Sequence, residues 1–298
     1  MTTEKKRVIA LGFFDGIHLG HTALLERTKE RARELNATPS VLTFDTPPGQ
    51  LVTGERVPLI NSPAGRVDLI ERLCGIRDVL ILHFDEQFRR MDWMEFITAL
   101  QEKFGAIHVV CGHNFNFGYG GEGTPQRLRE RCAALGIGCD IIGEVAVDGQ
   151  VVSSTYIRKL LLAGEIERAN QFLGHPHTLV DTVRYGYKLG RTIGAPTINM
   201  TFSDGVLTPA RGVYATRVYL DTPYIAVTNI GLRPTVGKAD QMTVESYILD
   251  FSGNLYGRQV RVEFFHFIRP EIKFDSMEAL KHQIQRDAEV VRAYFSPS

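Results

Sequence analysis

Two histidines three residues apart, His18 and His21, lie in a glycine-containing segment near the start of the chain, 12–21 (GFFDGIHLGH). An apolar run precedes the segment and a helical pattern follows it, so the histidines belong near the N-terminus of a helix. Helix N-termini favour phosphate because their backbone N–H groups and dipole attract anions. Two imidazoles there can donate hydrogen bonds to phosphate oxygens as charge develops during transfer. The alternative is a pair of surface or metal-binding histidines.

A second glycine-rich segment, 186–199 (GYKLGRTIGAPTIN), lies in the back half of the chain. Glycines at this spacing suit a loop whose backbone approaches phosphate groups. If its last residues are extended, Thr197 and Asn199 point to the same side, because side chains alternate along a strand. A hydroxyl and an amide oxygen suit a hard cation such as Mg²⁺, which also takes waters and substrate phosphates. The alternative is a Gly-Pro turn entering a strand with outward polar residues.

A single carboxylate, Glu245, lies within a strand-like apolar run, 243–251 (TVESYILDF). Acidic side chains in such runs need a partner or a role. Glu245 is therefore a candidate for such a role, and an exposed strand glutamate is the alternative.

A fourth polar segment, 152–158 (VSSTYIR), has the composition of a helix start. Ser153 or Ser154 can cap a helix that runs through Leu162. Thr155 and Arg158 then share one face, and an arginine can bind phosphate as a forked donor. An ordinary capped helix with a solvated arginine is the alternative.

The front part of the chain alternates strand-like and helix-like segments, which predicts a parallel sheet with helices on both faces. The strand-like segments are 7–13, 39–44, 79–82, 107–111 and 139–142, and the helix-like segments are 24–35, 93–104 and 127–135.

The pattern changes after Gly174, where short strand-like runs are separated by Gly, Pro, Asn or Asp. The runs 212–220, 224–229, 243–251 and 258–268 predict an antiparallel barrel or sandwich. A final amphipathic helix follows, with Asp275 as the expected cap and Glu278 three residues on. We therefore expect two domains, 1–174 and 175–298.

The composition is that of an ordinary globular protein of 298 residues, with 34 basic and 34 acidic side chains. This neutrality disfavours a nucleic-acid binder or a protein held on an anionic membrane by bulk charge. The N-terminal segment lacks a secretory apolar region, and the four cysteines include no C-x-x-C pair. We expect a cytoplasmic protein with buried cysteines, and nothing in the sequence indicates an oligomeric state.

The histidine segment resembles the H-x-G-H motif of the nucleotidyltransferase superfamily, in which both histidines contact the triphosphate of ATP. Its longer form, F-D-G-x-H-x-G-H, resembles the adenylyltransferase module of bacterial bifunctional riboflavin kinase/FAD synthetases. Segment 112–118 (GHNFNFG) resembles the G-x-[DN]-F-x-F-G segment of that module, and 152–158 resembles its S-S-T-x-I-R segment.

The second glycine segment resembles the G-R-x-x-G-x-P-T-x-N motif of riboflavin kinases, with Ala195 where Phe is common. Further segments of the kinase module follow in the expected order. They are 211–215 (RGVYA), 229–235 (NIGLRPT) and 244–251 (VESYILDF).

Together these resemblances imply an α/β nucleotidyltransferase-like (Rossmann-like) parallel-sheet domain followed by an antiparallel β-barrel domain with a C-terminal helix. The back module would phosphorylate riboflavin with ATP and Mg²⁺, giving FMN. The front module would join FMN to AMP from a second ATP, giving FAD and pyrophosphate. Riboflavin, FMN, FAD and ATP are thus the expected partners, with no nucleic acid and no membrane.

The resemblance also implies residue roles. Catalytic residues would be Glu245, as the base, and His18 and His21. Nucleotide-binding residues would be Gly12, Phe13, Asp15, Gly16, His18, His21, Asn114, Ser153, Ser154, Thr155 and Arg158 in the front module, and Gly190, Arg191, Gly194 and Thr197 in the back module. Flavin-binding residues would be Asn114, Phe115, Phe117 and Glu245, and the metal ligands would be Thr197 and Asn199.

Two alternatives remain open. Thr46, Pro47 and Asn116 depart from the family pattern, which leaves a kinase with a degenerate front module as one alternative. A flavin-binding regulator without turnover is the other. Retention of both the histidine pair and Glu245 favours the bifunctional enzyme.

Overall fold

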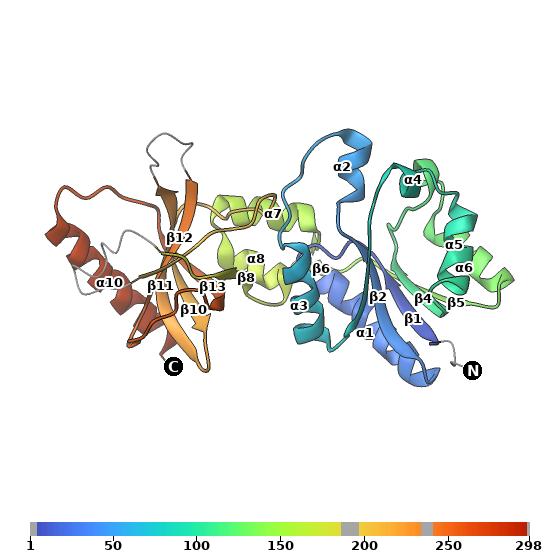
Figure 1. Ribbon diagram of the computed structural model, residues 1–298, viewed down its shortest axis with the longest axis horizontal. Helices are drawn as coiled ribbons and strands as arrows, with labels where there is room; N and C mark the ends of the chain where they lie inside the picture. Colours follow the sequence, from blue (N-terminus) through green and yellow to red (C-terminus); the bar gives the residue numbers. More distant parts are fainter. Residues whose placement is uncertain (1–4, 186–196, 234–240, 297–298) are drawn as a thin grey trace. The chain divides into compact units, whose positions relative to one another are not determined.

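The computed structural model describes residues 5–185, 197–233 and 241–296. The chain divides into two compact units, Met1–Ser153 and Ser154–Ser298 (Figure 1). Within the described residues, no helix has the length and apolar character needed to cross a membrane.

The first unit alternates strands and helices as the sequence predicts. In chain order it contains β1 (Arg7–Leu11), α1 (Leu19–Glu34), β2 (Thr38–Phe44), α2 (Pro48–Thr53), α3 (Pro63–Cys74), β3 (Asp78–Leu82), α4 (Glu86–Arg89), α5 (Trp93–Glu102), β4 (Ala106–Gly112), the short 3₁₀ helix η1 (Tyr119–Gly121), α6 (Pro125–Ala134), β5 (Gly138–Ile142), β6 (Ala146–Val147) and β7 (Gln150–Val151).

Five of these strands form a parallel sheet in the order β3-β2-β1-β4-β5. Helices α1 and α3 cover one face, and α5 and α6 cover the other (Figure 1). Side chains of β1 point alternately to the two faces of the sheet: Val8 packs towards α1 and α3, and Ile9 packs towards α5 and α6. Three of the cysteines are buried in these layers. The parallel-sheet prediction is confirmed.

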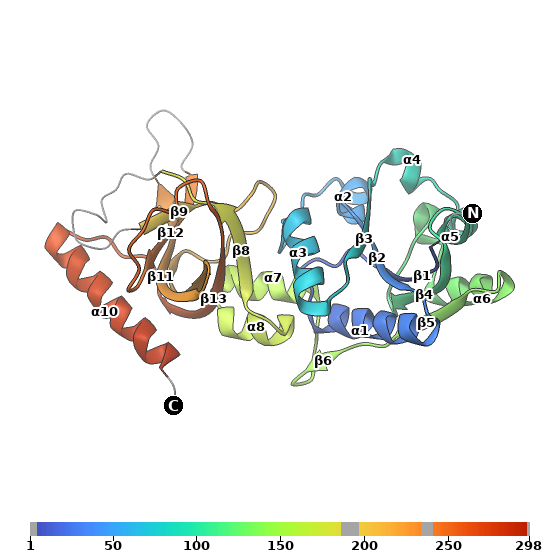
Figure 2. The same cartoon turned by 60° about the horizontal axis from the view of Figure 1, so that its bottom comes forward.

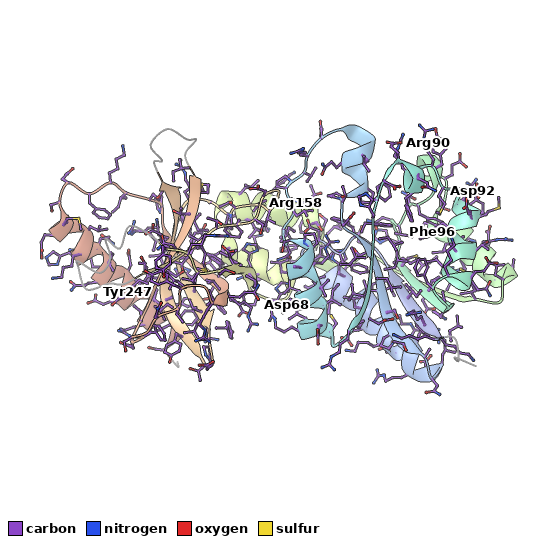
Figure 3. The ribbon with its side chains drawn as sticks, in the orientation of Figure 1. Asp68, Arg90, Asp92, Phe96, Arg158 and Tyr247 are labelled. Atoms are coloured by element: carbon purple, nitrogen blue, oxygen red, sulfur yellow. The ribbon has the colours of Figure 1, made fainter. Side chains whose placement is uncertain are left out.

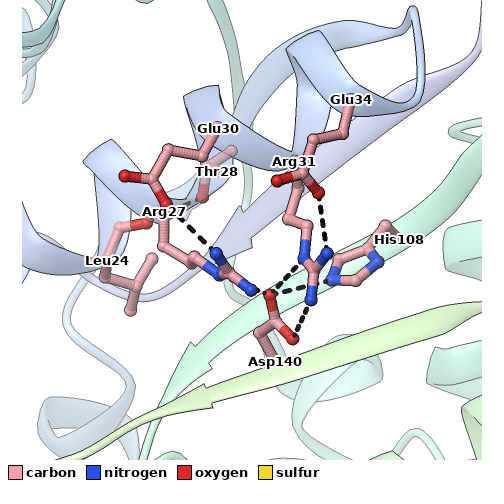
Figure 4. A network of polar contacts seen from close by, with 8 residues as sticks. All are labelled: Leu24, Arg27, Thr28, Glu30, Arg31, Glu34, His108 and Asp140. Carbon is pink, nitrogen blue, oxygen red and sulfur yellow. Dashed lines mark hydrogen bonds and ion pairs between the residues drawn. The ribbon is translucent and has the colours of Figure 1, made fainter.

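A polar network fastens α1 to the sheet through Asp140 of β5 (Figure 4). Arg27 Nε and Arg31 Nε each lie 2.7 Å from the Asp140 carboxylate. Burial alone would raise the pKa of Asp140, but the hydrogen bonds from Arg31 and Arg27 outweigh it and lower this pKa to about 2. The network therefore keeps its charges at any physiological pH and fixes the helix that carries the histidine pair.

The second unit opens with two helices and continues as a β-rich structure. It contains α7 (Ser154–Ala163), α8 (Ile166–Leu173), β8 (His177–Thr182), β9 (Thr197–Met200), β10 (Gly212–Tyr219), β11 (Pro223–Arg233), β12 (Gln241–Ile248), β13 (Gln259–Arg269) and α10 (Met277–Phe295).

The six strands of this unit form one curled antiparallel sheet in the order β8-β13-β10-β11-β12-β9. Just beyond β8, the backbone N–H of Arg184 donates to the carbonyl of Asn199 at 2.8 Å, so the two edge strands meet at one point. This curled, barrel-like sheet with a helix after it agrees with the fold expected for the back module.

Helix α10 packs on the outside of that sheet (Figure 2). Its cap is Ser276, whose hydroxyl accepts the Ala279 N–H at 3.1 Å, so the expectation of Asp275 was wrong by one residue. A second anchor is the pair of hydrogen bonds from Arg269 of β13 to the buried carboxylate of Asp287.

Candidate active sites

The histidine segment lies where a parallel sheet of this kind binds ligands. The chain runs from β1 outward through β2 and β3 and then returns to place β4 on the other side of β1. In such sheets the ligand crevice forms at the carboxyl ends of the strands where this direction changes. The segment that begins at Gly12 follows β1, and the segment 112–118 follows β4. Two motifs far apart in sequence therefore follow neighbouring strands at the same end of the sheet.

The backbone of the histidine segment is held in sparsely populated conformations. Phe14 has φ of 58°, Gly16 has φ of 91° and Ile17 has φ of 44°. A β-branched residue such as Ile17 rarely adopts a positive φ. Phe14 and Ile17 are both fully buried, so packing of their side chains stabilises these conformations. Strain of this kind concentrates at functional sites, where the surrounding structure maintains it.

The side chain of Asp15 holds the histidine segment in place through hydrogen bonds to a second stretch of backbone. Its carboxylate is 2% exposed and accepts hydrogen bonds from the backbone N–H groups of Ile60 at 2.9 Å and Asn61 at 3.3 Å. These two residues form the turn that precedes α3. These hydrogen bonds thus fix the shape of the loop that carries the histidines.

The two histidines form one unit at the start of α1. His18 is the N-cap, and its Nδ1 accepts a hydrogen bond from the His21 backbone N–H at 3.3 Å. The two rings stack with centroids 3.6 Å apart and planes 13° apart. A Cβ on Gly20 would lie 3.3 Å from the His18 ring, so a glycine there lets the ring lie against the helix. Because Nδ1 accepts, the His18 proton sits on Nε2, which can donate.

His21 is kept neutral by its surroundings. Burial, followed by the nearby His18 and the cation of Arg66, lowers the pKa of His21 well below its usual 6.5. Its Nδ1 is buried and has no hydrogen-bond partner among the described residues. His21 is therefore a neutral imidazole, a form that can donate a hydrogen bond to an anion.

The segment after β4 carries an exposed amide and an aromatic pair. Asn114 is exposed, with its Oδ1 close to Gly112. The rings of Phe115 and Phe117 stack at 5.4 Å, and Phe117 also packs at 5.3 Å on Phe96, which lies on α5 (Figure 3). Phe117 is buried and Phe115 half-buried, so Phe115 presents the more accessible ring.

The predicted helix cap and phosphate-binding residues of segment 152–158 lie at the start of α7, as expected. Ser154 is the first helical residue and Ser153 precedes it. Thr155 is exposed, and Arg158, labelled in Figure 3, is half-buried one turn later. Both belong to the helix that opens the second unit.

The kinase candidates lie on three adjacent strands of the second unit. Glu245 of β12 is directly opposite Asn199 of β9 on one side and Asn229 of β11 on the other. Residues directly opposite each other in antiparallel strands share a face with Cβ atoms about 5 Å apart. Thr197, two residues before Asn199, lies on the same face opposite Tyr247, which Figure 3 labels. The sheet therefore brings together the predicted base and the predicted metal ligands.

The donors on this face suit a hard cation. Asn199 is only 8% exposed, and its Oδ1 has no hydrogen-bond partner among the described residues. A buried amide oxygen of this kind is a ready ligand, and the hydroxyl of Thr197 is a second oxygen on the same side. Gly190, Arg191 and Gly194 lie outside the described residues.

The opposite face of these strands is the interior of the curled sheet. There the hydroxyls of Thr216, Thr228 and Ser246 form a buried row, with oxygens 2.7 and 2.8 Å apart. Ser246 directly follows Glu245, so the alternation of side chains puts the acidic group outside and the hydroxyl inside.

Two residues missed by the sequence reasoning belong to these sites. Arg66 of α3 is buried beside Phe13, and its helix was not predicted. Its signal was a lone arginine in the apolar stripe that also contains Leu69 and Ile70. Asn229 begins a segment noted for its resemblance, but only the strand register reveals that it lies beside Glu245.

Comparison with protein families gives a match for each part of the chain. Residues 1–156 match the FAD synthetase family, and residues 173–295 match the riboflavin kinase family. The first match contains the histidine pair, and the second contains Thr197, Asn199 and Glu245.

Curated relatives and a solved structure match along the whole length. A bifunctional riboflavin kinase/FMN adenylyltransferase of Listeria monocytogenes is 33% identical, with 99% of this chain and 94% of the relative covered. The enzyme of the same description from Escherichia coli K12 is 36% identical, covering 97% and 92%. A crystal structure described as a macrolide-efflux protein from Streptococcus pneumoniae has a TM-score of 0.86 and 31% identity, covering 98% and 95%; that similarity supports the fold. The chain belongs to the bifunctional riboflavin kinase/FMN adenylyltransferase family.

Proposed function

We propose that the two activities of this family are carried out at the two sites described above. The histidine pair at the carboxyl end of β1 serves FMN adenylyltransferase, and the Asn199–Glu245–Asn229 row serves riboflavin kinase. The observation that carries the proposal is the strand register, because it aligns Glu245 with Asn199 without any reference to the family.

In the kinase reaction the 5′-hydroxyl of riboflavin attacks the γ-phosphorus of ATP. The new bond joins the flavin oxygen to phosphorus, the bond between this phosphorus and the β-phosphate oxygen breaks, and ADP leaves. Glu245 takes the hydroxyl proton. Asn229 lies directly opposite Glu245 and is placed to orient its carboxylate. The loop glycines Gly190 and Gly194 and the side chain of Arg191 are proposed nucleotide contacts.

Thr197 and Asn199 are proposed to hold Mg²⁺ together with the phosphates of ATP. The buried Asn199 oxygen without a described partner supports this assignment. Bound there, Mg²⁺ would neutralise charge on the β- and γ-phosphates.

In the adenylyl transfer a phosphate oxygen of FMN attacks the α-phosphorus of ATP. The new bond joins the two phosphates, the bond between the α-phosphorus and the β-phosphate oxygen breaks, and pyrophosphate leaves. The FMN phosphate is already ionised, so no base is required. His18 and His21 stabilise the charge that develops on the triphosphate, and alignment supplies the rest.

Further contacts for the adenylyl transfer are proposed from the remaining predicted residues. Nucleotide contacts are assigned to Gly12, Phe13, Asp15, Gly16, Asn114, Ser153, Ser154, Thr155 and Arg158, and flavin contacts to Asn114, Phe115 and Phe117. The exposure of Asn114 and the partial exposure of Phe115 support their roles. Thr46, Pro47 and Asn116 are proposed to be tolerated departures.

We place the functional boundary between the domains at Gly174, giving 1–174 and 175–298. The riboflavin kinase match, which begins at residue 173, supports this position. By packing alone, α7 and α8 go with the second unit, since α8 contacts β8 and β13. The protein is proposed to act in the cytoplasm on riboflavin, FMN, FAD and ATP, without nucleic acid or membrane partners.

The metal assignment is tested with Asn199→Ala. FMN formation is measured at increasing Mg²⁺, and FAD formation from supplied FMN is measured in the same preparation. We expect the variant to need about tenfold more Mg²⁺ for half-maximal FMN formation, about 1.4 kcal/mol of lost affinity, with FAD formation unchanged. An unchanged Mg²⁺ dependence of FMN formation would contradict the assignment.

A further inference from the structure

Arg66 is a buried arginine at the edge of the adenylyl-transfer site. It lies on α3 and is 1% exposed. Arginine is almost never buried to this degree unless it is paired, because removing its charge from water is energetically costly. An apolar side chain at this position would complete the stripe formed by Leu69 and Ile70. The arginine therefore needs an explanation other than stability.

Its contacts join the carboxyl ends of β1 and β2. Arg66 Nη1 donates to the carbonyl of Phe13 at 2.7 Å, to Thr43 Oγ1 at 2.8 Å and to the carbonyl of Phe44 at 2.9 Å. The Thr43 hydroxyl also donates to the Phe13 carbonyl at 2.9 Å. Phe13 is the residue from which the histidine loop departs, so this cluster fixes where that loop begins.

The charge of Arg66 is only partly compensated. Its guanidinium lies 4.2 Å from the centre of the Phe13 ring, which attracts cations. Nε and Nη2 are inaccessible to solvent and have no hydrogen-bond partner in the described part of the chain. The carboxylates of Asp15 and Asp45 favour the cation, but burial outweighs them and lowers the pKa of Arg66. The remaining positive charge also acts on His21, as its lowered pKa indicates.

A fixed positive charge stabilises the transition state at a triphosphate site, because a preorganised cation in low-dielectric surroundings does not have to rearrange when negative charge develops. With only 1% of its surface exposed, Arg66 has almost no face left for a substrate to contact.

We propose that Arg66 is a positioning residue of the adenylyl transfer, which fixes Phe13 at the start of the histidine loop and supplies positive charge beside His21 without contacting substrate. This inference rests on the proposed location of the adenylyl transfer at the histidine pair.

The test uses two variants. Arg66→Met keeps the side-chain volume and removes the positive charge, whereas Arg66→Lys keeps the charge and removes the guanidinium group. Arg72→Met on the same helix is the matched control, since Arg72 forms an i,i+4 ion pair with Asp68 along the helix surface. Steady-state FAD formation from FMN and ATP is measured against pH. Fluorescence of Trp93, the single tryptophan, reports folding of the first unit.

We expect Arg66→Met to lower kcat for FAD formation about 100-fold with the KM values unchanged, because misplacement of about 1 Å has effects of this size. The acidic limb of the pH profile of kcat moves to higher pH in Arg66→Met, because the pKa of His21 rises when the cation that lowers it is lost. The other charged groups acting on His21 and Arg66 are His18, Asp15 and Asp45. Arg66→Lys should lose about tenfold in kcat, between the two extremes, with the acidic limb in place. Arg72→Met should behave as wild type.

A folded Arg66→Met with wild-type kcat would overturn the proposal, and so would a raised KM for ATP with kcat unchanged, which would indicate direct contact. If Arg66→Met does not fold, Arg66→Lys decides: wild-type kcat contradicts the proposal and a lowered kcat with the acidic limb in place supports it. Failure of the proposed function is distinguishable, since the wild-type chain would then form no FAD, or would form it after loss of His21.

Discussion

His18 caps the helix that carries His21. Its Nδ1 accepts the His21 backbone N–H at 3.3 Å, and the two rings stack at 3.6 Å. One hydrogen bond thereby fixes three things: the start of α1, the tautomer of His18 and the spacing of the two imidazoles. Protonation of His18 at Nδ1 would remove the acceptor, so the cap exists only with a neutral ring.

The two roles of His18 can be separated. Asparagine is a good N-cap, whereas alanine is not. We expect His18→Asn to retain stability and His18→Ala to lose about 1 kcal/mol of the free energy of unfolding of the first unit. Both variants should lose about 100-fold in FAD formation, because both lack the imidazole. Urea unfolding followed by Trp93 fluorescence, together with the rate of FAD formation, checks this. Full activity of His18→Asn would mean that capping is the only role of His18.

Glu245→Gln keeps the shape of the side chain and removes the base. We expect FMN formation to fall at least 100-fold, within the range typical of a general base, while FAD is still made from supplied FMN. Both rates are measured by chromatography of the flavins. Loss of both activities in a folded Glu245→Gln protein would contradict the separation of the two sites.

A buried histidine makes the second unit sensitive to acid. His177 is 1% exposed, packs against Phe202 and Phe264, and has no hydrogen-bond partner at either ring nitrogen among the described residues. Burial, with a smaller effect of His175, lowers its pKa from 6.5 to about 3. The unfolded chain therefore binds a proton below pH 6.5 that the folded chain does not, and stability falls as the pH falls from 6.5 towards 3.

We expect wild type to lose about 2 kcal/mol more of its free energy of unfolding between pH 7 and pH 5 than His177→Phe, from about 1.4 kcal/mol per pH unit over about 1.5 units. Urea unfolding followed by circular dichroism measures this. His282→Gln is the control, because His282 is exposed and should leave the pH dependence as it is. Equal losses in wild type and His177→Phe would contradict the assignment.

The anchor of α10 is the pair Arg269–Asp287. The Asp287 side chain is 3% exposed and receives two hydrogen bonds from the guanidinium. Arg269→Leu leaves a buried carboxylate with only Gln283 as a donor among the described residues, so we expect a loss of about 3 kcal/mol in the free energy of unfolding. The surface pair Arg292–Asp250 is the control, and Arg292→Leu should cost about 0.5 kcal/mol. Equal effects of the two variants would show that burial of Asp287 does not matter.

Strong hydrophobic patterns were read correctly from the sequence. The five parallel strands and the β-rich second unit came from apolar runs bounded by turn residues, and the structure contains them. The position of the histidine pair at the start of a helix was also predicted correctly, because three-residue spacing near a helix start leaves little choice of geometry. Helix α3 was not predicted; its buried stripe contains Arg66 together with Leu69, Ile70 and Cys74, so the apolar pattern is interrupted there.

Long-range neighbours could not be predicted in this way. Asn229 lies beside Glu245 only because β11 and β12 pair in one particular register, and a shift of one residue would turn Asn229 to the interior. The contacts of Arg66 with Phe13 and Thr43 likewise depend on how α3 packs on the sheet. Such relationships need the fold as well as the local pattern.

The most direct test of two separate sites is complementation between two inactive variants. His21→Ala and Glu245→Gln are purified separately and each is given riboflavin, ATP and Mg²⁺. We predict that His21→Ala makes FMN at the wild-type rate with little FAD, that Glu245→Gln makes either flavin at least 100-fold more slowly than wild type, and that a mixture of the two makes FAD. A mixture that stops at FMN, or FAD formed from riboflavin by either variant alone at the rate of the mixture, would contradict the account.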